Sequence, residues 1–396
     1  MKKILFSILT FSFLALPVLA DDVTTPSPNV VSTAMPSLTI APDGRSAGMG
    51  DAGVATSADI NSQHWNPAKY AFMESKGGLS VSYTPWLRQL VGDIDLAYIV
   101  GYYNMGEKAG TLSGSFKYFS MGEVSMVGFD ESFLGTATPN EWALDLGYSR
   151  KLHEYVSMAV AMRFMYSDLN NGFNSSMDGG SDMYPGWTMA ADIALYYRQP
   201  ISLPMGESYF GLGFNLSNLG GKISHDDGTT KNFIPANMRL GVSYELPFDN
   251  YNRLTATVEC NKMLVPTYKS KFAKNQETGR MEQDEFSQLT SVNGWWQSFC
   301  DAPNGAAEEF QEVQWSAGLE YSYNRQFFGR IGYSHEGFTK GNRRYLTLGA
   351  GFHLSIFSLD FAYCIATAAS NPLNNTMRFT LGFDLAGIKD MVNNRK

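Results

Sequence analysis

A serine, a histidine and a glutamate follow one another at Ser334, His335 and Glu336, and hydrolytic enzymes use these residue types together. A serine nucleophile needs its base within hydrogen-bond reach. These residues lie in a stretch with strand-like alternation, where consecutive side chains point to opposite faces, so Ser334 and His335 cannot easily share a hydrogen bond. The chain also has no G-x-S-x-G nucleophile elbow. We therefore predict no catalytic residues and no enzymatic activity.

Histidines and aspartates are the next residues that could do chemistry, by binding a metal ion. No two histidines have metal-ligand spacing, and there is no HExxH motif. The run His225-Asp226-Asp227-Gly228 contains two aspartates, too few for a calcium site, so a solvated turn is the better interpretation. We expect neither a metal nor a cofactor. The five histidines are His64, His153, His225, His335 and His353.

Three glycines, Gly48, Gly50 and Gly53, could form a loop that cradles a phosphate. A nucleotide-binding loop requires a preceding strand and a following Lys-Ser/Thr pair, and neither is present. The alternative is a tightly folded segment that needs positive φ and close backbone packing. Asn66-Pro67 fits a turn that ends such a segment.

A cluster of large aromatic side chains, Trp295, Trp296 and Phe299, lies in a long predicted loop over residues 265–310. Such a cluster costs solubility unless something covers it. The loop could fold over the mouth of the protein or lie at a membrane interface, where Trp is favoured. The other interpretation is a patch that binds partner or cargo proteins, because Trp dominates interface hot spots. The sequence leaves both open.

Cysteine usage is sparse, with Cys260, Cys300 and Cys364 and no CxxC spacing. An odd number of cysteines excludes a complete disulfide framework. Three unrelated small apolar residues are the simpler interpretation, and a link from Cys300 to another chain is the alternative.

The first twenty residues predict export from the cytoplasm. Lys2 and Lys3 are followed by an apolar stretch from Ile4 to Leu16 and by the small residues of Val18-Leu19-Ala20. This is the pattern of a secretory signal peptide, and the apolar run is too short for a transmembrane helix.

Downstream of residue 77, apolar and polar residues alternate, which is the pattern of strands with one apolar and one polar face. In the last such segment, Met377, Phe379 and Leu381 alternate with Arg378 and Thr380. Most segments have the length of about 9–13 residues that a tilted strand needs to cross a bilayer. The fourteen candidate strands lie near 78–86, 93–104, 109–120, 140–150, 155–168, 187–199, 207–217, 235–246, 252–264, 311–323, 326–338, 344–354, 357–366 and 375–386.

Segments of this kind are stable in lipid only as a closed cylinder, because every backbone N–H and C=O must find a partner within the protein. The connections alternate between short turns and long loops, as in outer-membrane barrels with extracellular long loops. We therefore predict an all-β fold: a 14-stranded antiparallel transmembrane β-barrel with an N-terminal plug, integral to the outer membrane and in contact with its lipid. The net charge of −8 argues against a nucleic-acid partner.

The predicted organisation has four parts: a signal peptide (1–20), an N-terminal extension with a plug or hatch (21–77), the barrel (78–386) and a periplasmic tail (387–396). The inward faces of the strands are mostly Gly, Ser, Thr and charged residues. Candidate polar residues of the lumen are Arg239, Glu245, Glu320 and Arg378.

Two stretches resemble known families. The run Gly48-Met49-Gly50-Asp51-Ala52-Gly53-Val54-Ala55, followed by Asn66-Pro67-Ala68, resembles the N-terminal hatch of the FadL family of outer-membrane transporters. The longer string from Thr39 to Ser57, together with Asn371-Pro372-Leu373-Asn374-Asn375-Thr376-Met377-Arg378-Phe379-Thr380-Leu381, is similar to the PorV family (also called LptO) of the type IX secretion system in the Bacteroidetes. The plug motif that the resemblance implies comprises Gly48, Gly50, Asp51, Gly53, Asn66 and Pro67.

The resemblance implies a role in protein transport to the cell surface. Members of the PorV family accept secreted proteins, through a C-terminal signal domain, from the translocon barrel (SprA or Sov) and deliver them to the surface sortase PorU. The alternative is a FadL-type channel for long-chain fatty acids or other hydrophobic compounds, which the polar inward faces disfavour. A lipopolysaccharide O-deacylase is the third candidate, with little support from the residues.

Overall fold

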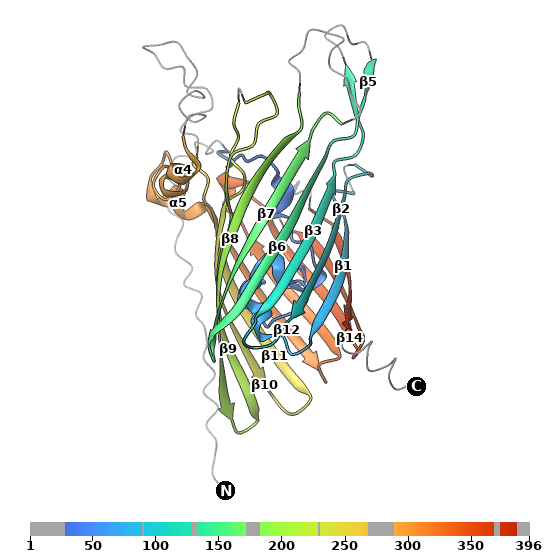
Figure 1. Cartoon of the computed structure of the whole chain (residues 1–396), viewed down its shortest axis with the longest axis vertical. Helices are drawn as coiled ribbons and strands as arrows, with labels where there is room; N and C mark the ends of the chain where they lie inside the picture. The colour runs from blue at the N-terminus through green and yellow to red at the C-terminus, as the bar shows by residue number, and fades with distance from the viewer. Residues whose placement is uncertain are drawn as a thin grey trace.

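Fourteen strands form one closed antiparallel barrel in the computed structural model (Figure 1). Each strand pairs with its neighbours along the chain, β3 pairs directly with β6, and β1 closes the barrel against β16, where Gly78 stands opposite Asp384. The structure describes residues 28–88, 91–127, 131, 133–171, 183–228, 230–267, 289–367 and 373–385. The barrel strands are β1 (Gly77–Pro85), β2 (Asp95–Asn104), β3 (Thr111–Ser120), β6 (Asn140–His153), β7 (Val156–Asp168), β8 (Gly186–Leu203), β9 (Gly206–Gly220), β10 (Asn237–Pro247), β11 (Asn252–Met263), β12 (Val313–Tyr323), β13 (Phe327–His335), β14 (Arg344–His353), β15 (Phe357–Ala366) and β16 (Met377–Asp384).

The predicted alternation of apolar and polar residues corresponds to outward-facing and inward-facing side chains of the barrel. On β16, Phe379 is 41% exposed while the next residue, Thr380, is 1% exposed. Consecutive strand residues point to opposite faces, so the outer surface is an apolar band and the interior is polar. The sequence prediction of fourteen strands in a closed barrel is confirmed.

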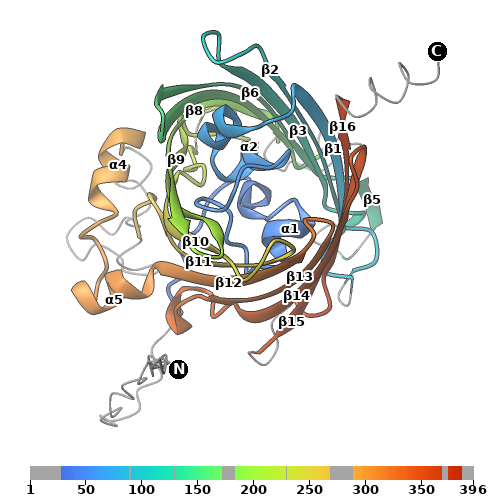
Figure 2. The same cartoon turned by 90° about the horizontal axis from the view of Figure 1, so that it is seen from below.

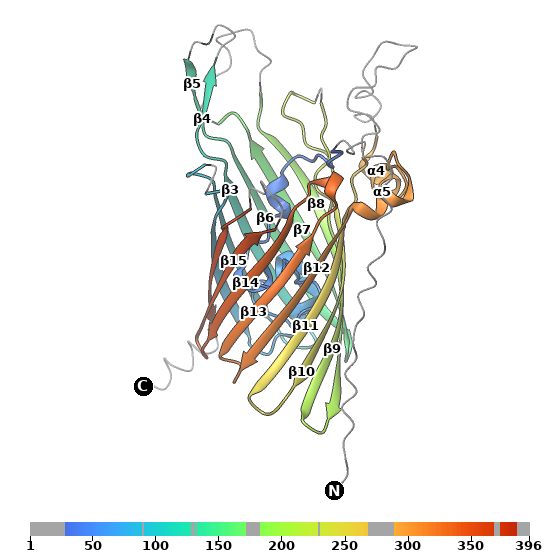
Figure 3. The same ribbon diagram turned by 180° about the vertical axis from the view of Figure 1, so that it is seen from behind.

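The two ends of the barrel differ (Figures 1 and 3). At one end, short turns such as residues 154–155, 204–205 and 324–326 join the strands. At the other end the connections are longer, as the alternating loop lengths predicted, and several of them carry their own secondary structure. We call these the short-turn end and the long-loop end.

Residues 28–76, here called the inner segment, lie mostly within the ring of strands (Figure 2). Their first residues lie at the long-loop end, where Asn29 donates to the carbonyl of Thr339 and to Glu308. Their short helices are η1 (Pro36–Thr39), α1 (Gly44–Ala47), α2 (Ser62–Trp65) and η2 (Pro67–Phe72). Trp65 and Tyr70 are fully enclosed, at 2% and 0% exposure. Of the helices in the described part of the chain, none has the length and apolar character needed to cross a membrane.

The structure adds elements that the alternation did not predict. A small hairpin, β4 (Val124–Val127) with β5 (Phe133–Ala137), rises above the long-loop end (Figure 1). Two short helices, α4 (Ser291–Gln297) and α5 (Ala306–Gln311), form within the stretch predicted as one long loop. A short helix, η4 (Phe338–Lys340), lies between β13 and β14.

Candidate functional site

The inner segment folds around Asp43, which caps the N-terminus of α1. Its Oδ2 accepts a hydrogen bond from the backbone N–H of Ser46 at 2.9 Å, and its Oδ1 accepts one from Trp65 Nε1 at 2.6 Å. One aspartate therefore satisfies a buried helix-end donor and fixes the position of a large ring. Lys69 donates to the carbonyl of Gly53 at 2.8 Å, which ties the second half of the segment to the first.

Glycines bring the inner segment into backbone contact with the wall. A Cβ on Gly50, whose φ is +74°, would lie 2.7 Å from the backbone of Tyr333. A Cβ on Gly53 would lie 2.5 Å from the ring of Trp65, and one on Gly48 would lie 3.0 Å from Cα of Gly349. These contacts fit the interpretation of the glycine run as tight packing with one positive φ angle.

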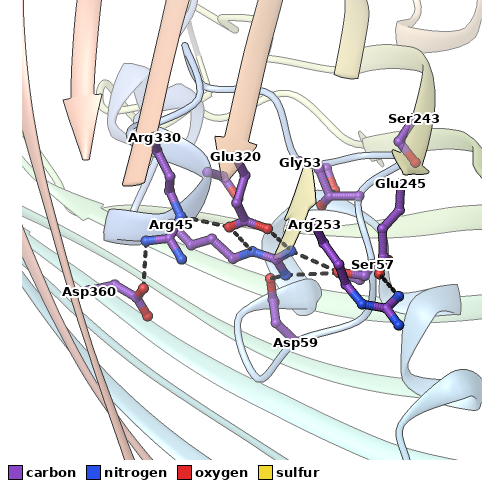
Figure 4. Close-up of polar contacts among 12 residues, drawn as sticks. Arg45, Gly53, Ser57, Asp59, Ser243, Glu245, Arg253, Glu320, Arg330 and Asp360 are labelled. Atoms are coloured by element: carbon purple, nitrogen blue, oxygen red, sulfur yellow. Dashed lines mark hydrogen bonds and ion pairs between the residues drawn. The ribbon is translucent and has the colours of Figure 1, made fainter. Parts of the chain in front are cut away.

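A chain of ion pairs crosses the interior at the level of α1 (Figure 4). Arg45 donates to Glu320 at 2.9 Å and to Asp59 at 2.8 Å. Arg330 donates to the same Glu320 at 2.7 Å and to Asp360 at 2.6 Å. The inner segment and strands β12, β13 and β15 are thus joined by charge-assisted hydrogen bonds with little exposure to solvent.

The remaining plug-motif residues also contact the wall or hold the segment together. Asn66 donates to the carbonyls of Val54 and Leu195, each at 3.0 Å, and its own side-chain oxygen caps η2. Asp51 accepts from the hydroxyl of Tyr345 at 2.6 Å. Pro67 occupies the first turn of η2.

The predicted lumen residues all lie on the inner side of the wall. Arg239, Glu320 and Arg378 are buried, with 3–4% exposure. Glu245 is half-buried near the short-turn end, where it accepts from Arg253 at 2.7 Å. A further buried group, Arg163 with Asp145 and Asp192, was not singled out from the sequence, although its residues occupy the inward positions of the alternation.

Within the described part of the chain, two cavities flank the inner segment. The larger, about 510 Å³, lies at the short-turn end, and the smaller, about 80 Å³, lies at the long-loop end. Charged side chains line both. The lining of the larger cavity includes Arg45, Asp59, Arg198, Glu245, Arg253 and Asp384.

Helices α4 and α5 lie outside the ring of strands, beside β10 to β12 (Figure 2). Trp296 is 73% exposed and Phe299 42%, while Trp295 is half-buried. Phe310 on α5 packs against Trp315, an outward-facing residue of β12, with ring centroids 5.9 Å apart. We call Trp295, Trp296, Phe299 and Phe310 the rim patch; it lies on the flank of the barrel and not over its mouth.

Acidic residues behind the rim patch are neutralised by lysine. The carboxylate oxygens of Asp301, Glu309 and Glu312 lie within 4.8 Å of one another. Lys262 Nζ contacts Glu309 at 3.1 Å and Glu312 at 2.7 Å, so an ammonium group already supplies positive charge there. Burial, with the nearby glutamates, raises the pKa of Asp301 to about 6, even though the Thr267 N–H that donates to it lowers the pKa.

The structure places the residues considered for catalysis apart. Ser334 Oγ accepts from Gln314 at 3.0 Å on the inner face, and His335 Nδ1 lies 3.4 Å from the hydroxyl of Tyr333. Glu336 pairs with Arg343 at 2.8 Å. The run from His225 to Gly228 forms a turn in which Asp226 bonds Ser224 and Thr230.

A closed fourteen-strand barrel with an apolar outer band and a folded segment inside defines an integral outer-membrane β-barrel protein. A family model described as the type IX secretion system protein PorV matches residues 23–270, and the chain belongs to this family. With that assignment, the long-loop end is extracellular and the short-turn end periplasmic.

The fold is similar to that of a solved hydrocarbon channel. The TodX deltaS2S3 mutant monoaromatic hydrocarbon channel is 12% identical, with a TM-score of 0.51 over 86% of this chain and 98% of that chain. A FadL homologue from Pseudomonas aeruginosa is 10% identical, with a TM-score of 0.41 over 90% of this chain and 100% of that chain. At this level of identity the likeness concerns the fold alone. No curated protein sequence matches the chain significantly.

Proposed function

We propose that this protein is a non-enzymatic component of type IX secretion. It accepts cargo proteins from the translocon barrel (SprA or Sov) by binding the C-terminal signal domain of the cargo. It then delivers the cargo to the sortase PorU. The observation that carries the proposal is the PorV-family match over residues 23–270. A closed barrel fixed in the outer membrane suits the role, because it presents long extracellular loops while remaining anchored in lipid.

The filled interior supports a role in handling cargo rather than conducting solutes. The inner segment is held by the Arg45–Glu320 and Arg330–Glu320 pairs and by backbone contacts at Gly50. Buried ion pairs of this kind keep a segment in one position, because separating the two partners leaves a buried charge without compensation. We propose that the inner segment acts as a plug that keeps the barrel from leaking while cargo is handled outside.

The rim patch is our candidate contact for cargo or partner proteins. Trp296 and Phe299 are exposed, and large aromatic residues supply much of the binding energy at protein interfaces. The patch lies on the flank of the barrel, so a partner embedded in the same membrane could approach it laterally.

Deletion of the gene tests the proposal. Secretion of proteins with C-terminal signal domains should stop, cargo should accumulate in the periplasm, and the wild-type gene should restore export. A complementing copy with Trp296→Ala and Phe299→Ala should restore export poorly, whereas Phe248→Ala, an exposed aromatic on a periplasmic turn, should restore it fully. Normal secretion in the deletion strain would refute the proposal.

A FadL-type channel for long-chain fatty acids is the second candidate, favoured by the likeness of the fold to hydrocarbon channels. The charged linings of both cavities disfavour it, because a fatty-acid chain requires a continuous apolar site. Uptake of labelled fatty acid distinguishes the two. Saturable uptake that depends on this gene, with normal secretion, would favour the channel.

A lipopolysaccharide O-deacylase has the least support, because Ser334 bonds Gln314 rather than a base. Purified protein should leave the acylation of lipid A unchanged. If the purified protein removed an acyl chain from lipid A and the Ser334→Ala variant did not, the deacylase would become the better candidate.

A further inference from the structure

The small cavity at the extracellular end, of about 80 Å³, lies between the inner segment and the wall. We call it the upper chamber. Thr39, Asp51 and Trp65 form its inner side, while the wall contributes arginines from two strands that are not neighbours, Arg239 of β10 and Arg378 of β16. A third arginine, Arg343, lines the same space, as do the carboxylates of Asp51, Glu259, Glu312 and Glu336.

Arg239 is 4% exposed and stacks on an indole ring, with its Cζ 4.6 Å from the ring centroid of Trp65. Its Nε lies 4.0 Å from Oε1 of Glu259, which is an ion pair but too long for a hydrogen bond. Glu259 uses its other oxygen to accept the backbone N–H groups of Gly53 and Val54, at 2.8 and 2.9 Å. Nε and Nη1 of Arg239 have no hydrogen-bond partner among the described residues.

Arg378 is arranged in a similar way. It is 3% exposed, and its Cζ lies 5.8 Å from the ring centroid of Trp86. Its Nη1 is 3.7 Å from Oδ1 of Asp51, whose other oxygen accepts the hydroxyl of Tyr345. Nε of Arg378 also lacks a hydrogen-bond partner within the described part of the chain.

Buried guanidinium donors are normally hydrogen-bonded, because a buried unsatisfied donor carries the full penalty of desolvation. Arg45, below the chamber, meets this rule through carboxylates at hydrogen-bond distance. Arg330 meets it at Nε and Nη1, while its Nη2 has no partner among the described residues. Arg239 and Arg378 depart from it while lining the same cavity. An acceptor with several oxygens, bound in this cavity, would pair with these unsatisfied donors.

We propose that the upper chamber binds a small oxyanion, a carboxylate or a phosphate group, between Arg239 and Arg378. A cavity needs about 10–15 Å³ to hold one water molecule. The upper chamber, at about 80 Å³, therefore holds a carboxylate or phosphate group with some water but not an acyl chain. The planar guanidinium fork suits two-pronged recognition of these anions. The inference does not depend on the secretion role.

Binding is tested on the purified full-length barrel in detergent by isothermal titration calorimetry with acetate and with phosphate, each against chloride at equal ionic strength. We expect saturable binding of at least one of them. The acetate arm reports a carboxylate ligand and the phosphate arm a phosphoryl ligand. Failure of both to bind the wild-type protein would overturn the proposal, because water alone would then satisfy the arginines.

Substitutions locate the site. Arg239→Gln and Arg378→Gln should each weaken binding about tenfold or more, the effect of losing one charge-assisted hydrogen bond. Arg253→Gln, which changes an arginine lining the periplasmic cavity, should leave binding unchanged. Equal binding in all variants, or equal loss in all of them, would refute the assignment.

A second variant covers the case in which an arginine substitution prevents folding. Asn237→Asp keeps both arginines and adds a negative charge to the lining of the upper chamber. It should weaken binding of both anions by repulsion while the barrel keeps its heat-modifiable mobility in detergent gels. Unchanged binding in a folded Asn237→Asp barrel would contradict the proposal.

Discussion

Gly332 on β13 faces Gly50 of the inner segment so closely that a Cβ on Gly332 would lie 2.1 Å from the backbone nitrogen of Gly50. Real side chains do not approach backbone this closely, so the wall has no side chain at the point where the segment turns. Similar contacts join Gly318 to Met49 and Gly213 to Val54. The glycines on the inward faces are therefore the docking surface of the inner segment.

Gly332→Ala should loosen the inner segment without destroying the barrel. A forced methyl group in a packed contact costs about 1–3 kcal/mol, and here the obstacle is backbone. We expect faster protease cleavage within residues 28–76 and higher ion conductance in planar bilayers. Gly329→Ala is the matched control on the same strand, since no atom lies within 4 Å of its added Cβ. Equal conductance in the two variants would contradict this role for Gly332.

Glu320→Gln should destabilise the protein strongly. Glu320 accepts from both Arg45 and Arg330, so its neutralisation removes one carboxylate partner from each, leaving Asp59 and Asp360. Breaking a buried ion pair in this way costs about 3–5 kcal/mol. Urea unfolding in detergent measures the effect. Arg88→Gln, which removes an exposed pair with Asp95, should leave the unfolding curve unchanged. Similar curves for the two variants would show that the buried pairs contribute little.

The docking of α4 and α5 on the barrel should weaken as pH rises from about 4 to about 6. The pKa of Asp301 is raised from its ordinary value of 3.8 to about 6, so between these values the docked state holds a proton that the released segment has lost. Stability falls across this window and becomes constant above it. Hydrogen exchange at the Thr267 amide, which donates to Asp301 at 2.8 Å, reports the change after correction for intrinsic exchange. Asp301→Asn should abolish the dependence, and an unaltered profile in that variant would assign it to another group.

Trp296→Ala should leave the barrel as stable as the wild type, because the side chain is 73% exposed. If the rim patch contacts a partner, the same change should reduce co-purification of the sortase or the large translocon barrel in mild detergent. Phe248→Ala on the periplasmic turn serves as the control. Full recovery of partners with Trp296→Ala would remove the rim patch from the proposed interface.

A maleimide that cannot cross membranes should label intact cells at Cys300. Cys300 is exposed and follows α4, whereas Cys364 is buried and Cys260 half-buried. Cys300→Ser should remove the signal. Labelling that appears only after the cells are broken open would place the long-loop end in the periplasm.

The alternation of apolar and polar residues predicted the barrel strands, because burial on one face of a strand repeats every two residues. This pattern can be recognised in each strand without knowing which strands pair with it. It did not predict α4, α5 or the β4–β5 hairpin, whose contacts do not follow a single period. Nor could it pair the lumen charges. Arg45 lies 275 residues from Glu320 in the chain, and nothing local connects them. Arg330 and Asp360 could have been found, because both lie at inward positions of their strands.

Pairing of β1 with β16 joins the beginning of the barrel to its end. The backbone N–H of Gly44, in the enclosed segment, donates to the hydroxyl of Thr380 on β16 at 2.9 Å. The residues that fill the interior therefore also brace the strand that closes the wall.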